Sequence, residues 1–148
     1  MSLESEIIQE IKNKGWDIKY DGKTVENIYG QEFEVNFEES DGFFTLAGYI
    51  NPSGKEIIIR DPDPSYVALT QADSRGDLMA QTLAHELGHA DSYWISYGLS
   101  ALIVSLGVQQ AIRNKSVKPI AYATVAFVGC RLFVDEVIAE SFACAFHD

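Results

Sequence analysis

The sequence predicts an α+β fold, and three observations support this prediction. Apolar residues have helical spacing in residues 2–14 and again from residue 73 onward. Between these segments, residues 16–60 show the alternation and turn signals of strands. The chain has 148 residues, which suits one domain with a hydrophobic core, so we treat residues 1–148 as a single domain.

Residues 2–14 are expected to form a short amphipathic helix. Ser2 can cap its start and Gly15 can end it. The stripe that would face the core consists of Leu3, Ile7, Ile8 and Ile11.

Strands are expected next, and together with the first helix they make up residues 1–72. The segments 16–20 and 33–37 alternate apolar and polar side chains. Two further strands, 43–50 and 56–60, are separated by strong turn residues and should pair as a hairpin. We therefore expect a small antiparallel sheet.

The pentapeptide His85-Glu86-Leu87-Gly88-His89 carries the strongest functional signal. It falls in an expected helix over 73–91, which opens with a sequence resembling a capping box at residues 74–77. Residues four apart share a helix face, so His85 and His89 can bind one metal ion. Glu86 is placed to take a proton from water rather than to bind the metal. The alternative is a helix with two partly exposed histidines and no metal.

Residues 92–134 predict an apolar helical hairpin. Two nearly uncharged arms, 93–112 and 119–134, flank a polar, basic connector at 113–118. Each arm is near the ~20 residues needed to cross a bilayer. The alternatives are membrane insertion and burial in the domain core or at an oligomer interface. Serines and glutamines in the first arm and Arg131 in the second favour burial in protein. The oligomeric state is not predicted.

A catalytic zinc ion usually has three protein ligands and a water, so the two histidines need a partner. A third histidine six residues after His89 is excluded, because that position is Ile95. His147 is the remaining histidine, but it lies at the C-terminus, where chains fray.

A better third ligand lies in the helix expected over 135–148. Glu136 and Glu140 share one helix face among apolar residues, where an unpaired charge is costly. We expect Glu136 to bind the metal and Glu140 to accept a hydrogen bond from the far nitrogen of a ligand histidine. Asp135 is the competing candidate for the third ligand. The alternative for Glu136 and Glu140 is that both lie solvated on an exposed edge of the helix. The spacing alone does not decide which carboxylate faces the metal.

These two motifs, Thr82–His89 and Glu136–Ala143, resemble the glutamate-zincin metallopeptidases. The first has the Thr-Leu-Ala-His-Glu-Leu-Gly-His form of the ImmA/IrrE-type branch. In the second, Glu140 stands where that branch has asparagine. The long apolar interval between the motifs is more similar to the membrane-embedded HtpX/Ste24-type enzymes. The resemblance implies a zincin-like fold, in which residues 56–60 would run along the cleft above the metal helix.

We therefore expect a zinc-dependent peptidase that binds Zn²⁺ through His85, His89 and Glu136 and uses Glu86 as general base. Its substrate would be a protein or peptide. One alternative is a metal-binding regulatory module without turnover. Another is a membrane-associated interaction protein in which residues 93–134 are the functional part. Three tyrosines near the metal helix or on the hairpin are candidate oxyanion donors, and nothing in the sequence selects among Tyr93, Tyr97 and Tyr122.

Charge and cysteine content narrow the partners and the compartment. The net charge of −11 argues against nucleic acid as a partner, because phosphate binding needs a basic surface. An acidic N-terminal segment, unlike a signal peptide, predicts a cytoplasmic protein. Cys130 and Cys144 would be about 21 Å apart on one helix, too far for a disulfide, which agrees with a reducing compartment.

Overall fold

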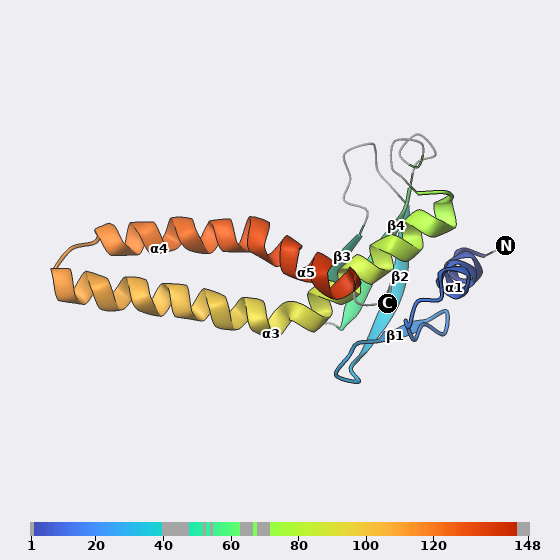
Figure 1. Cartoon of the computed structure of the whole chain (residues 1–148), viewed down its shortest axis with the longest axis horizontal. Coiled ribbons are helices and arrows are strands. Elements are labelled where there is room, and N and C mark those ends of the chain that lie inside the picture. Colours follow the sequence, from blue (N-terminus) through green and yellow to red (C-terminus); the bar gives the residue numbers. More distant parts are fainter. Residues whose placement is uncertain are drawn as a thin grey trace.

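The computed structural model describes residues 2–39, 48–51, 53, 55–62, 67 and 72–144. It confirms the α+β class, with a four-stranded sheet, helices that pack against it, and a long helical hairpin that projects away from both (Figure 1). We call the part of the described structure outside this hairpin the body.

Helix α1 (Leu3–Lys14) confirms the first predicted element. The Ser2 hydroxyl accepts a hydrogen bond from the Ser5 N–H at the N-terminus of the helix. Gly15 ends it with φ of 69°, a left-handed conformation that glycine adopts without strain. Ile7 and Ile11 are buried in the core, as the apolar stripe requires.

The sheet contains β1 (Thr24–Glu26), β2 (Glu32–Glu39), β3 (Gly48–Asn51) and β4 (Glu56–Asp61), in the order β1-β2-β4-β3. The predicted hairpin is confirmed where it is described, because β3 and β4 pair antiparallel. Residues 43–47 of its predicted first strand lie outside the described residues. The prediction of an antiparallel sheet is wrong at its centre, where β2 and β4 are parallel. The reason is that the β3–β4 hairpin docks on β2 through its second strand.

The strand predicted at 16–20 is wrong. Only Tyr20 forms a bridge, with Val25 of β1, and residues 16–19 have no regular structure. The Tyr20 N–H bonds locally to the Ile18 carbonyl, so this segment makes too few ladder bonds to count as a strand. The short β1 was not predicted.

Strand β4 occupies an inner position, which corrects the expectation that residues 56–60 run along the cleft. Ile57, Ile58 and Ile59 are all buried, so both faces of this strand are covered. The strand at the edge of the described sheet that lies beside the helix carrying His85 and His89 is β3. A Cβ added to Gly48 would lie 3.3 Å from the Glu86 Cγ.

Helix α3 (Arg75–Asn114) carries both predicted histidines. Its N-terminus is capped by the Ser74 hydroxyl, which accepts the Asp77 N–H. Met79, Leu83 and Leu87 of its first half are fully buried in the core. The helix does not stop near residue 91 but continues to residue 114, because no proline interrupts this stretch.

The second half of α3 pairs with α4 (Lys118–Gly129) and a π-helical turn, η1 (Cys130–Val134), to form the apolar hairpin, residues 93–134. The polypeptide then continues directly into α5 (Asp135–Cys144), which returns to the first half of α3 (Figure 1). The predicted hairpin and C-terminal helix are therefore confirmed as elements. Residues 145–148, which include His147, lie outside the described part.

The hairpin does not lie in the core of the domain, so the predicted alternative that its arms are buried in that core is wrong. Ile112, Val117, Tyr122, Val125 and Phe133 are each between 71% and 79% exposed. Among the described residues, α3 is the one helix long and apolar enough to cross a membrane, and 17% of its apolar window is buried. The core helix of a soluble protein can match such a window in length and composition, but it would be mostly buried.

An ion pair between Lys14 of α1, which reaches solvent, and the buried Asp77 of α3 predicts a pH-dependent contribution to stability. Lys14 Nζ lies 2.9 Å from Asp77 Oδ1, and the Asp77 side chain is 2% exposed. Burial opposes ionisation of Asp77, but its bonds with Lys14, the Asp73 N–H and Gln81 outweigh burial and lower its pKa. Lys14→Met should lower the free energy of unfolding by about 1–3 kcal/mol at neutral pH.

Chemical denaturation measures this effect, and Lys12→Met, an exposed change in the same helical turn, is the control. A carboxylate with a lowered pKa stabilises the fold above its unfolded-state pKa, and this contribution is lost as pH falls through the folded pKa. The difference between wild type and Lys14→Met should therefore shrink at acidic pH. Equal stability of the two Met variants at neutral pH would contradict the assignment.

Candidate metal centre

The centre forms where α5 packs closely against α3. A Cβ on Gly88 would lie 2.1 Å from the Ala139 carbonyl oxygen, closer than atoms can approach. Ala139 and Ala143 are buried at this contact. Small residues on both helices thus allow the two backbones to come together, and each helix brings its polar side chains to one place.

This packing brings three of the predicted site residues together. His85 Nε2 lies 3.1 Å from Glu136 Oε2, and His89 Nε2 lies 3.4 Å from Glu136 Oε1. One ligand atom from each of the three residues can be chosen so that all lie within 4.8 Å of one another. The predicted set of His85, His89 and Glu136 is therefore assembled from two helices.

The donor set fits a divalent metal ion. Two imidazole nitrogens and a carboxylate oxygen suit zinc, with bonds of about 2.0–2.2 Å and ligand atoms roughly 3.4 Å apart in a tetrahedron. The three donor atoms lie within 4.8 Å of one another, so side-chain adjustments of about 1 Å would bring them to that spacing. Other first-row divalent ions also accept these donors, so the donors by themselves do not select zinc.

The site opens to solvent on one side. A hollow of about 680 Å³ is lined by His85, Glu136, Val137, Glu140 and Ser141. The donors of His85 and Glu136 are therefore reachable from solvent on this side.

Glu140 lies where it can orient a ligand histidine. Its Oε2 is 3.0 Å from His85 Nδ1, so a proton on Nδ1 is donated to Glu140 and Nε2 is left to face the metal position. Burial opposes charging of His85. The Glu140 hydrogen bond and the charges of Glu86, Glu136 and Glu140 outweigh it, and the pKa of His85 is raised.

Glu86 lies on the buried side of α3, the helix that carries His85 and His89. It is 6% exposed, and this burial raises its pKa to about 7, with the Glu136 charge adding to the increase and His85 opposing it. Burial has the opposite effect on His89, whose pKa it lowers, because burial disfavours the charged form of either group. The centre therefore has a buried, titratable carboxyl group beside its three donors.

The competing candidates lie elsewhere or face away. Asp135 forms an ion pair with Arg131 at 2.6 Å and accepts a hydrogen bond from Ser96, so its carboxylate serves the base of the hairpin. Tyr122 lies beside Ala123, which packs at Gly107, roughly 27 Å along α3 from His89. This distance rules out Tyr122 as an oxyanion donor and leaves Tyr93 and Tyr97.

Sequence reasoning missed three residues in or next to the centre. Gly88 permits the close approach of α5, and its place between the ligand histidines gave no separate signal. Asp91 is fully buried, and its Oδ1 accepts the Ile28 N–H at 3.0 Å, which ties the loop before β2 to α3. Ser96 accepts a hydrogen bond from Arg131 at 2.7 Å. The four-residue spacing of Arg131 and Asp135 was a usable signal for that network.

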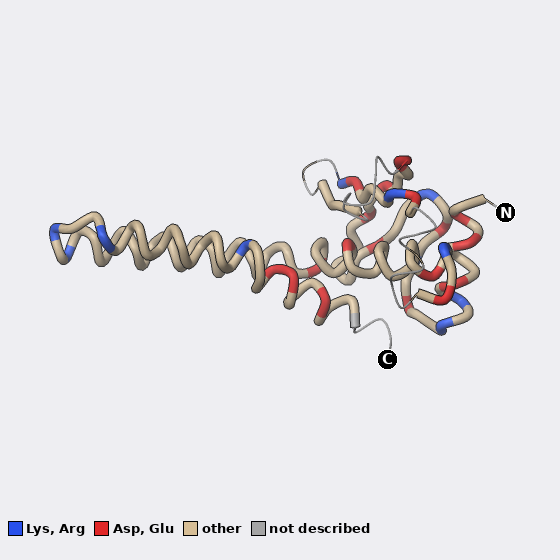
Figure 2. Tube along the Cα trace, turned by 90° about the horizontal axis from the view of Figure 1, so that it is seen from above, with Lys and Arg blue, Asp and Glu red and all other residues tan. Residues whose placement is uncertain are grey.

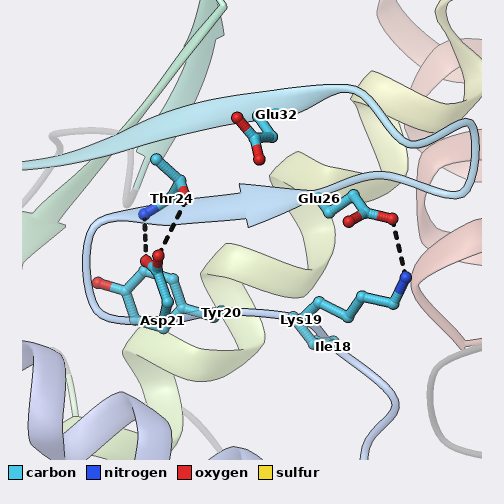
Figure 3. A pocket seen from close by; sticks show the side chains of 7 residues that line it. All are labelled: Ile18, Lys19, Tyr20, Asp21, Thr24, Glu26 and Glu32. Atoms are coloured by element: carbon cyan, nitrogen blue, oxygen red, sulfur yellow. Dashed lines mark hydrogen bonds and ion pairs between the residues drawn. The ribbon is translucent and has the colours of Figure 1, made fainter.

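A second hollow, between β1 and the segment before it, does not form a comparable site (Figure 3). Two of its three acidic groups, Asp21 and Glu26, already have partners. Asp21 accepts the N–H groups of Lys23 and Thr24, and Glu26 pairs with Lys19 at 2.8 Å. These bonds close a turn and need no ligand.

Comparisons with known proteins found no match to this chain among protein-family models, curated proteins or solved structures. Its function is therefore inferred from its residues and their geometry.

Gly88→Ala tests whether the close contact of α3 and α5 assembles the centre. The added Cβ must displace α5, so zinc affinity should fall by at least the ~10–100-fold typical of disturbed ligand support. Gly98→Ala is the matched control, since a Cβ there meets no atom within 4 Å. Competition with a chromophoric chelator measures the zinc affinity of both variants. Equal zinc affinity in the two variants would show that the contact does not position Glu136.

The order of zinc affinities tests the separate carboxylate roles. Affinity should fall from wild type to Glu140→Ala and further to Glu136→Ala, because losing a ligand costs more than the ~10–100-fold loss for an orienting partner. His147→Ala should remain close to wild type. A reversed order would exchange the roles of Glu136 and Glu140. Zinc loss in His147→Ala alone would move the third ligand to the C-terminus.

Proposed function

We propose that the protein is a zinc-dependent peptidase of the zincin type. The observation that carries the proposal is the convergence of His85, His89 and Glu136 within 4.8 Å, beside the buried carboxyl group of Glu86. The resemblance of the two motifs to glutamate zincins supports the choice of zinc and of peptide hydrolysis.

Zinc held there would supply Lewis-acid polarisation of the scissile carbonyl and lower the pKa of water towards ~7. Glu86 takes the proton of the attacking water and delivers it to the leaving amine. Glu140 keeps His85 in the tautomer that leaves Nε2 free for the metal, through its hydrogen bond to Nδ1.

Strand β3 gives the substrate a place to lie. It is the outer strand of the described sheet, paired with β4 on one side, and Gly48 brings it against Glu86. An extended peptide that adds to such an edge would present its backbone carbonyl groups along the cleft. The edge position of β3 supports peptides as the substrate class.

A metal-binding regulatory module without turnover is the second candidate. Such a module needs the three donors but has no use for a buried carboxyl group next to them. Burial of Glu86 therefore favours the peptidase.

The cytoplasmic setting inferred from the sequence stays a prediction, and Cys130 is free in the structure.

Glu86→Gln separates these two candidates. The variant retains both imidazoles and Glu136, so zinc should remain bound, while peptide hydrolysis should fall by about 10²–10⁴-fold because the general base is lost. Metal analysis and a generic peptidase assay, with and without a chelator, measure the two properties. Glu34→Gln makes the same chemical change on an exposed face of β2 and should alter neither.

Two results would contradict this assignment. Loss of zinc from Glu86→Gln would make Glu86 a ligand, and full activity of the variant would exclude it as the base.

A further inference from the structure

We propose that the apolar hairpin, residues 93–134, inserts into a lipid bilayer. The hairpin projects from the body as two packed helices, with nothing else in the described structure beside its outer part (Figures 1 and 2). Its surface is apolar although it is exposed: Tyr122 and Val125 are both 72% exposed and Phe133 is 71% exposed. Water is a poor solvent for such a surface, and hydrocarbon is a good one.

The side chains of the hairpin are arranged opposite to those of a soluble helical pair. Ser96, Ser100 and Gly107 of α3 are buried. A Cβ on Gly107 would lie 2.3 Å from the Ala123 Cβ, so small residues form the contact between the arms. Helix pairs in membranes use small residues inside and large apolar residues outside, because lipid rather than water surrounds them.

The exposed apolar surface covers the whole outward side of α3, not one stripe. At about 100° per residue, the exposed side chains of Trp94, Tyr97, Leu102, Leu106 and Ile112 spread over roughly 180° of the helix. A second copy of the hairpin would cover one part of this arc and leave the rest in water. A bilayer would cover all of it, so the arc favours lipid over a second copy.

The length of the arms fits a bilayer. The segment 93–112 spans about 30 Å at 1.5 Å per residue, close to the thickness of the hydrocarbon layer. The hairpin contains no acidic residue, and three of its four basic residues, Arg113, Lys115 and Lys118, gather at the tip (Figure 2). With arms of this length, these charges would lie beyond the hydrocarbon layer, in the headgroup region of the far leaflet.

The polar groups at the base of the hairpin would suit a position at the membrane–water interface. Arg131 is the one charged residue between the tip and the base, and it pairs with Asp135 and donates to Ser96. The aromatic residues Tyr93, Trp94 and Tyr97 lie at the same end, and such side chains prefer the membrane–water interface. The bilayer surface would therefore lie near the base of the hairpin.

Insertion would hold the metal centre at the membrane surface. His89 precedes Tyr93 by one helical turn, which is about 6 Å along α3. If the proposed peptidase function holds, its substrates would be peptide segments at or near the lipid surface. This consequence rests on the proposed function, whereas insertion itself does not.

Fractionation of the full chain after expression tests insertion without any catalytic readout. The wild type should pellet with membranes and resist extraction by alkaline carbonate, and Glu86→Gln should do the same. Leu102→Glu combined with Val128→Glu, on exposed mid-arm positions, should move most of the protein into the supernatant. Ile28→Lys with Tyr29→Lys, at exposed apolar positions of the body, should leave it in the membrane fraction.

A pair of fluorescence variants tests the wild-type hairpin directly. The chain has two tryptophans, Trp16 in the body and Trp94 at the base of the hairpin. In vesicles of phosphatidylcholine and phosphatidylglycerol, brominated lipid should quench most of the Trp94 emission in Trp16→Phe. It should leave the Trp16 emission in Trp94→Phe unchanged.

Three results would overturn the proposal. The first is wild-type protein in the supernatant, where light scattering would identify a dimer that covers the hairpin or a monomer that leaves it in water. The second is membrane attachment that survives the Leu102→Glu and Val128→Glu changes, because the attachment would then lie outside the hairpin. The third is equal quenching of the two tryptophans.

Discussion

The close packing of α3 and α5 is the constraint on which the rest of the structure depends. Gly88 has no side chain, and the Ala139 carbonyl occupies the space that a Cβ would fill. This contact places a carboxylate from one helix between two imidazoles of the other. The same contact sets Glu140 against His85, so the donors and the group that orients one of them depend on a single close approach.

The hairpin and the metal centre are built from the same two helical segments, so their geometries depend on each other. The π-helical turn at residues 130–134 inserts one extra residue between the second arm and α5. Such a residue rotates the next helical segment by about 100°, and α5 follows it with Glu136 and Glu140 facing His85. Asp135, one position earlier, faces the hairpin and pairs with Arg131. The boundary between the metal centre and the base of the hairpin thus falls between adjacent residues.

The sequence predicted the elements that depend on local signals and missed those that depend on distant contacts. Helix α1, β2 and the start of α3 follow from caps and apolar spacing, and the histidine–glutamate grouping followed from spacing and chemistry. The parallel pairing of β2 with β4 could not be read from either strand, because it depends on which strand of a hairpin docks. The role of Gly88 was equally invisible, since it depends on a carbonyl group 51 positions later in the chain. The exposed hairpin was predicted as an element, but whether its arms faced protein or solvent required the structure.

The most direct test of the metal centre is anomalous diffraction at the zinc absorption edge from crystals of the zinc-loaded full chain. We expect one strong peak within bonding distance of His85 Nε2, His89 Nε2 and a Glu136 carboxylate oxygen, about 2.0–2.2 Å from each. A peak bound by other residues, or no peak between α3 and α5 at equimolar zinc, would contradict the assignment of the centre.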